Sequence, residues 1–168
     1  MRVLGIDPGS HNTGWGVVEG KGNALVHVAS GTIRGGTGDA LCQRLCAIAD
    51  GLEGVLRRYG PQAVSVERVF SGQKKSALML AQARGVALLC AARFGAAVFE
   101  YTASQVKQAA TGRGMADKAQ VQQMVQVLLG LHGRRGFDTT DALAVAICHV
   151  AVASSAAARL IAGDDGSR

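Results

Sequence analysis

The sequence predicts a single α/β domain with a mixed five-stranded sheet and helices on both of its faces. Three strand-like segments open the chain as a meander, and two further short strands are each preceded by a helix-like segment. A meander followed by βα units gives a mixed sheet. The chain has 168 residues and 48% of them are hydrophobic, so it is long and apolar enough to bury one core.

Each predicted element depends on a periodic pattern. The strands have short apolar or alternating runs, and the helices have apolar residues at three- and four-residue steps. Strands are predicted at 3–6, 13–18, 24–34, 63–66 and 96–101. Helices are predicted at 39–59, 77–94, 116–131 and 137–157, with a short one capped by Thr102 or Ser104 that runs to Ala110. We expect one domain over residues 1–162 and a disordered tail over 163–168.

Two predicted strands end on a carboxylate. Asp7 closes the first strand and precedes the turn residues Pro8, Gly9 and Ser10, and Glu67 closes the strand at 63–66. A purely structural role for Asp7, capping the turn with its side chain, explains this stretch equally well. If the first and fourth strands are neighbours, however, Asp7 and Glu67 lie side by side at a strand edge where binding sites gather.

Two more acids open the last helix. Asp138 and Asp141 are three residues apart, so both lie on one helical face. Acids in a first helical turn also complement the helix dipole, and Asp138 is a possible N-cap. Clustered carboxylates repel one another unless a divalent cation lies between them, and oxygen ligands suit Mg²⁺ or Mn²⁺. Two such ions activate a water and stabilise the leaving oxygen of a phosphodiester.

The positive charge is concentrated in the middle of the chain. Residues 68–118 contain eight basic and two acidic side chains, an excess of +6 that equals the net charge of the whole chain. A basic surface of this kind suits a polyanion such as nucleic acid. Ordinary solvated lysines are the alternative explanation.

Other sequence features favour a reduced cytoplasmic protein without a membrane partner. No basic and apolar signal segment opens the chain, and the longest apolar helical run, 142–153, is too short to span a bilayer. The four cysteines form no Cys-x-x-Cys pair, so we expect them to be small buried hydrophobic residues.

Seven motifs in one register, from Val3 to about His149, together resemble the RuvC family of bacterial Holliday-junction resolvases. They are Gly5-Ile-Asp-Pro-Gly-Ser10 with Thr13-Gly14, Val66-Glu-Arg-Val-Phe70, Ala83-Arg-Gly-Val86, Phe99-Glu-Tyr101, Gln105-Val-Lys-Gln108, Lys118-Ala-Gln-Val121 and Asp138-Thr-Thr-Asp-Ala-Leu-Ala144. The resemblance implies a ribonuclease-H-like fold and a homodimer. It also implies Mg²⁺-dependent paired nicks in like-polarity strands of a four-way DNA junction, in recombination and repair.

The same resemblance implies roles for individual residues. Asp7, Glu67, Asp138 and Asp141 match the catalytic carboxylates that hold two Mg²⁺ ions, with Mn²⁺ as a possible substitute, although some relatives have histidine at the position of Asp138. Lys107 matches a basic residue near the scissile strand, where it would offset charge in the transition state.

The predicted DNA-binding residues include an aromatic side chain and several basic ones. Phe70 matches an aromatic that in the family inserts at the junction, and Arg84 lies in a matched motif where a structural role is equally plausible. The full set is Phe70, Lys74, Lys75, Arg84, Lys107, Arg113 and Lys118.

The family also implies a branch-migration motor of RuvA and RuvB as partner. We expect the small-residue helix 77–94 to form the dimer interface. Two other functions stay open: a junction-binding scaffold without chemistry, and a fragment of an actin-like phosphate-binding protein. The second normally needs two domains around a nucleotide, and the chain has no Walker motif.

Overall fold

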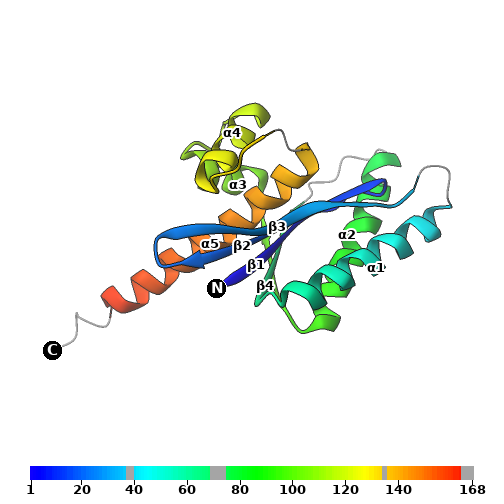
Figure 1. Ribbon diagram of the computed structural model, residues 1–168, viewed down its shortest axis with the longest axis horizontal. Coiled ribbons are helices and arrows are strands. Elements are labelled where there is room, and N and C mark those ends of the chain that lie inside the picture. The colour runs from blue at the N-terminus through cyan, green and yellow to red at the C-terminus, as the bar shows by residue number, and fades with distance from the viewer. Residues whose placement is uncertain (37–39, 69–74, 134–135, 164–168) are drawn as a thin grey trace.

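The computed structural model describes residues 1–36, 40–68, 75–133 and 136–163, with side chains described for all of these except 75–76 and 156–163. Figure 1 shows the strands between two groups of helices. The elements in chain order are β1 (Arg2–Asp7), β2 (Asn12–Lys21), β3 (Ala24–Arg34), α1 (Leu41–Tyr59), β4 (Ala63–Glu67), α2 (Lys75–Phe94), β5 (Ala97–Tyr101), α3 (Ala103–Thr111), α4 (Lys118–Leu128) and α5 (Phe137–Gly163).

The sheet has the predicted mixed topology. Its strand order is β3-β2-β1-β4-β5. Strand β2 is antiparallel to both β1 and β3, whereas β1, β4 and β5 run parallel to one another. Ile6 pairs with Val66, so the next residue on each strand is a carboxylate, Asp7 on β1 and Glu67 on β4. The condition for Asp7 and Glu67 to lie side by side, that the first and fourth strands are neighbours, is met.

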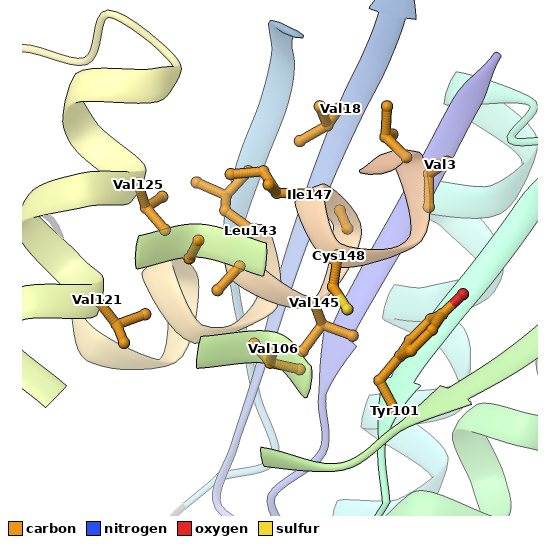
Figure 2. Close-up of a cluster of buried hydrophobic side chains, with 14 of the residues drawn as sticks. Val3, Val18, Tyr101, Val106, Val121, Val125, Leu143, Val145, Ile147 and Cys148 are labelled. Atoms are coloured by element: carbon orange, nitrogen blue, oxygen red, sulfur yellow. The ribbon is translucent and has the colours of Figure 1, made fainter. Parts of the chain in front are cut away.

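The two faces of the sheet carry separate cores. Successive side chains of a strand point to opposite faces. Val3 therefore packs with α3, α4 and α5, whereas Leu4 and Ile6 pack with α1 and α2. Figure 2 shows the first of these cores, where Val121 and Val125 of α4 and Val106 of α3 approach the side chains of α5. By the same alternation Asp7 and Glu67 belong to the α5 face.

Helix α5 is buried on nearly every side because the sheet covers one side of it and helices α3 and α4 cover another. Glycines on the strands let it approach closely. A Cβ atom added to Gly5 would overlap the carbonyl oxygen of Ala142, and one added to Gly14 would overlap the carbonyl oxygen of Asp138. Backbone-to-backbone packing at these two points sets the position of the first turns of α5.

Several helix boundaries differ from the prediction for local reasons. Helix α4 starts at Lys118 because Asp117 is its N-cap and accepts a hydrogen bond from the backbone N–H of Gln120. Its end comes before Gly130, which has a positive φ of 60°. Thr102 caps α3 as predicted. Helix α5 continues through Gly163, the first residue of the predicted tail, and residues 164–168 lie outside the described part.

Two helices are long and apolar enough, by length and composition alone, to span a membrane. The windows 77–94 in α2 and 137–155 in α5 have the length and mean hydropathy of membrane spans, 1.4 and 1.3 respectively, so the expectation that the longest apolar run is too short was wrong. In α5 61% of that window is buried, as in the core helix of a globular domain, against 22% in α2. Length and composition alone are weak indicators of a membrane span.

The cysteines divide into two pairs. Cys90 and Cys148 are buried as expected, but Cys42 and Cys46 are exposed on α1, so the prediction was wrong for them. All four are free thiols. The reason is position: Cys42 and Cys46 lie one turn apart, on a side of α1 that does not contact the core.

Candidate active site

Asp7 is the last residue of β1 and is half-buried. The turn after it is closed by Thr13, whose hydroxyl donates to the carbonyl oxygen of Gly9 over 2.9 Å and accepts from the Gly9 N–H over 3.4 Å. The Asp7 carboxylate forms no hydrogen bond or ion pair with any described residue. The turn-capping role considered for Asp7 is therefore filled by Thr13, and Asp7 is left for another purpose.

Three further carboxylates surround Asp7. Glu67 occupies the equivalent end of the neighbouring strand β4. Asp138 and Asp141 lie in the first turns of α5. The backbone of Asp138 packs against Gly14 of β2, and Gly14 is the residue that pairs with Asp7 of β1. Because α5 begins at Phe137, Asp138 is already inside the helix and is not its N-cap. The predicted gathering of four acids at one end of the sheet is what the fold produces.

The four acids repel one another. The pKa of Asp7 is raised from 3.8 to about 7, first by burial and then by the charges of Asp141, Asp138 and Glu67. Burial and the charge of Asp141 likewise raise the pKa of Glu67. Since nearby anions and desolvation both disfavour a charged carboxylate, this end of the sheet is short of positive charge.

Two lysines supply part of that missing charge. The Lys118 ammonium lies 2.6 Å from a carboxylate oxygen of Asp141, and this hydrogen bond is the main cause of a raised lysine pKa. The same ammonium lies 4.9 Å above the centre of the Phe137 ring, a cation–π distance. Lys107 acts on Glu67, whose pKa its charge lowers. Neither lysine contacts Asp7 directly.

Two of the four acids and both lysines line a pocket of about 280 Å³ between α5, α3 and α4. Its charged lining residues are Glu67, Lys107, Lys118 and Asp141, and its apolar ones are Ala103, Val106, Val121 and Ala144. A larger pocket of about 540 Å³ between α3 and α5 is lined by no charged side chain. Chemistry therefore places the site in the smaller pocket, where acids and bases converge.

The donor set fits a hard divalent cation. All four candidate ligands offer carboxylate oxygens, and their mutual repulsion is the electrostatic condition that such a cation relieves. Within the described residues, no three His, Cys, Asp or Glu side chains stand close enough to form a preassembled cage. Lys118 engages one carboxylate oxygen of Asp141, Oδ2, and therefore competes with a cation for this carboxylate.

Comparison with known proteins identifies the relatives of this arrangement. A sequence profile of the family described as crossover junction endodeoxyribonuclease RuvC matches residues 3–149. The chain belongs to the RuvC family. It is 51% identical over 150 residues to the RuvC protein of Cupriavidus necator, covering 89% of this chain and 83% of that protein. The RuvC protein of Trichlorobacter lovleyi is 51% identical over 151 residues, covering 89% and 85%.

Solved structures agree with the RuvC assignment. The RuvC protein of T. thermophilus, solved in complex with a Holliday junction substrate, superposes with a TM-score of 0.87 at 34% identity and covers 93% of this chain and 96% of that one. The yeast mitochondrial Holliday junction resolvase Ydc2 shares the fold, with a TM-score of 0.63 at 13% identity over 88% of this chain and 78% of that one. The ribonuclease-H-like fold predicted from the sequence is confirmed.

The predicted DNA-binding residues of this RuvC-family chain fall into different situations. Lys107 and Lys118 line the site, and Arg113 is exposed on the loop between α3 and α4. Arg84 instead forms an ion pair with Glu100 of β5, which favours the structural role considered for it. Three predicted contacts cannot be placed: Phe70 and Lys74 lie outside the described residues, and the side chain of Lys75 does too.

Sequence reasoning missed two contributors to the site. Phe137, half exposed, lies under the Lys118 ammonium, and Gly14 makes room for the start of α5. The signal for Phe137 was its position next to Asp138, at the first residue of the predicted helix. Gly14 was part of a quoted motif, but its task depends on a helix that lies more than a hundred residues further along the chain.

Proposed function

We propose that this RuvC-family chain resolves four-way DNA junctions by paired, metal-dependent nicks in strands of like polarity, in homologous recombination and repair. The observation that carries the proposal is the meeting of Asp7, Glu67, Asp138 and Asp141 at one sheet end, beside Lys107 and Lys118. The similar T. thermophilus protein has been solved with a Holliday junction substrate. That likeness supports the substrate class, a four-way DNA junction.

The four carboxylates are the proposed metal ligands. Two Mg²⁺ ions, or Mn²⁺, held by these oxygens would supply the activation of the attacking water and the stabilisation of the leaving 3′ oxygen. Asp7, which lies beside Glu67 on the neighbouring strand and close to the acids of α5, would hold the metal together with them. Glu67, Asp138 and Asp141 would complete the ligation.

The two lysines have distinct proposed tasks. Lys107 lines the pocket without an ion-pair partner among the described residues, so its ammonium is free to offset charge on the phosphate undergoing attack. Lys118 holds Asp141 and rests over Phe137 in the absence of DNA. If Asp141 bound a cation instead, the Lys118 ammonium would be available to a phosphate oxygen of the DNA.

We propose a homodimer that uses helix α2. The exposed side of α2 is mainly apolar and includes Leu78 and Leu89, which are 64% and 53% exposed and lie eleven residues, or three helical turns, apart. Arg93 adds one positive charge near the end of the helix, and the other exposed residues are Ala81, Gln82, Gly85, Ala92 and Phe94. A twofold axis through it would set two sites at a fixed spacing, which suits paired nicks in a junction of near-twofold symmetry.

Family membership also supports a place for the chain in the cytoplasm, next to the chromosome and without a membrane partner. On the same ground we propose that it acts with the branch-migration motor of RuvA and RuvB. Addition of the purified motor proteins to the junction-cleavage assay tests this partnership, because a functional complex changes the position and yield of the cuts.

The decisive experiment compares the wild-type protein with Asp7→Asn on a synthetic four-way junction and on a linear duplex, with Mg²⁺ and with EDTA. The proposal expects wild-type cleavage of the junction only, dependent on Mg²⁺. It expects Asp7→Asn to bind the junction with unchanged affinity and not to cut. Cleavage that survives the substitution would contradict the metal site, and equal cutting of linear duplex would contradict junction specificity. A scaffold would bind but cut under no condition.

A further inference from the structure

Met115 is the most exposed large hydrophobic side chain among the described residues, at 96%. It lies in the loop between α3 and α4, in a turn that Arg113 and Ala116 close by a backbone hydrogen bond of 3.3 Å. Arg113 is also exposed, whereas Ala116 is buried. The turn therefore has one end anchored in the core and presents a thioether and a guanidinium to solvent.

The turn is held rigidly. The Thr111 hydroxyl accepts a hydrogen bond from the Arg113 N–H over 3.1 Å, and the Gln108 amide donates to the carbonyl oxygen of Gly112 over 2.9 Å. Gly112 has a positive φ of 74° and ends α3 in the left-handed conformation. The exposure of Met115 is thus a property of a fixed backbone and not of a loose loop.

The turn stands at the edge of the active site. Lys107, one helical turn before Thr111, and Lys118, three residues after Met115, both line the active-site pocket. Three residues of extended chain span at most about 10 Å, so the Met115 backbone lies within that distance of Lys118. Along one DNA strand this corresponds to about three nucleotide steps of 3.4 Å each. A strand that is bound at the carboxylates and runs toward the start of α4 would therefore come within reach of the turn.

We propose that Met115 is an apolar wedge that inserts between neighbouring bases of the junction close to the cleaved strand, while Arg113 contacts a flanking phosphate. This inference rests on the proposed junction-cleaving function. Proteins that unstack and bend DNA use such wedges, methionine among them. The flexible, polarisable thioether adapts to an irregular gap between bases.

The surroundings of Met115 favour DNA over a protein partner. Three of its charged neighbours, Lys107, Arg113 and Lys118, are basic and complement a phosphate backbone, and the acidic neighbour Asp117 is engaged as the N-cap of α4. A single exposed side chain is also much smaller than the apolar patches of a few hundred Å² that mark protein-docking surfaces. For a base step, in contrast, one side chain is enough.

The test uses the full chain and a four-way junction with 2-aminopurine at the crossover, because the fluorescence of this base rises when it unstacks. Binding is measured without divalent cations, and cleavage with Mg²⁺. We expect Met115→Ala to remove most of the fluorescence gain and to weaken junction binding about five- to tenfold, and Met115→Gln to behave in the same way. Met115→Leu, which keeps an apolar wedge, retains the wild-type signal.

Two controls make the result specific. Val127→Ala truncates another exposed apolar side chain, 66% exposed on α4, and should leave fluorescence and binding unchanged. A junction with unpaired bases at the crossover should restore tight binding to Met115→Ala, because the unstacking is already done.

Equal fluorescence and affinity for Met115→Ala and the wild type would overturn the wedge while wild-type cleavage keeps the proposed function intact. Loss of binding to a partner protein without any change in DNA opening would overturn it as well. If the wild type neither binds nor cuts junctions, the proposed function itself fails, and the wedge with it.

Discussion

The two faces of the sheet are built alike but treat their carboxylates differently. On the α2 face, Glu100 of β5 forms an ion pair with Arg84, and its carboxylate oxygen Oε2 lies 3.7 Å from Nε of Arg68. On the α5 face, Asp7 and Glu67 end their strands without an arginine partner among the described residues, and the acids of α5 add to the negative charge. Both faces have an apolar core of similar residue types.

The difference teaches how to separate structural acids from functional ones in this molecule. An acid whose charge is neutralised by neighbouring arginines stabilises the contact between a helix and a strand. Acids that raise one another's pKa stay costly to the fold until a cation arrives. Burial, the largest cause of the raised pKa of Asp7 and Glu67, and the lack of an arginine partner within the described part of the chain together distinguish these two acids from Glu100.

The sharpest test of this comparison is a matched pair of substitutions, Glu67→Gln and Glu100→Gln. We expect Glu67→Gln to lower junction cleavage at least about a thousandfold, since it removes a proposed cation ligand, with little change in thermal stability. Glu100→Gln should keep cleavage and lose about 1 kcal/mol of unfolding free energy, because the pair is partly exposed. Cleavage assays and denaturant unfolding of both variants measure these two effects. The opposite pattern would break the comparison.

The close approach of α5 predicts the next largest effect. Gly5→Ala should lower the free energy of unfolding by about 3 kcal/mol, because its Cβ would overlap the carbonyl oxygen of Ala142 and push the helix outward. Cleavage should fall as well, since Asp141 neighbours the displaced residue. Urea unfolding measures the first effect. A Gly5→Ala protein as stable as the wild type would show that α5 is free to shift.

Removal of the Asp7 charge should stabilise the metal-free protein. The folded state raises the pKa of Asp7 from 3.8 to about 7, so it binds a proton more tightly than the unfolded chain does. Wild-type stability therefore falls as the pH rises through this interval, and Asp7→Asn escapes that loss. In EDTA we expect the variant to gain on the order of 2 kcal/mol above pH 7 and nothing below pH 4. Thermal unfolding of both proteins across pH, in EDTA and in parallel with Mg²⁺, measures the fall in wild-type stability and the gain of the variant.

The smallest expected effect serves as a control on the other face. Gly54 is exposed within α1, and a Cβ added there meets nothing within 4 Å. Gly54→Ala should raise the unfolding free energy by about 0.5–1 kcal/mol, because alanine favours the helix and restricts the unfolded chain. Cleavage should not change. A loss of stability would mean that Gly54 is constrained as Gly5 is, and would contradict the proposed difference between the two faces.

Much of the fold could be predicted from local patterns. The β3 boundaries, the Thr102 cap and the end of α2 at Phe94 agree with the prediction, because alternation, capping chemistry and turn glycines act over a few residues. The boundaries that moved lie where signals were weak. The alanine-rich end of α5 contains no stop signal before Gly163, and α2 begins at Lys75, so Ser76, which was expected in the preceding loop, lies inside the helix.

The residues of the candidate site could be predicted from the sequence, but the electrostatic interactions among them could not. Chain position suggested Asp7, Glu67, Asp138 and Asp141. Their mutual repulsion depends on distances across three elements, and the attachment of Lys118 to Asp141 depends on where α4 docks. Arg84 shows the converse, since its motif was visible in the sequence and its partner Glu100 was not.

The sequence by itself determined the order of the strands and helices, the α/β class and the carboxylate at the end of each of two strands, because these follow from side-chain periodicity and local backbone chemistry. Only the tertiary structure decided which acids share a face, which basic groups neutralise them, and that Met115 stands exposed on a rigid turn at the edge of the site. Strand pairing and helix docking join residues far apart in the chain, and no local pattern records such contacts.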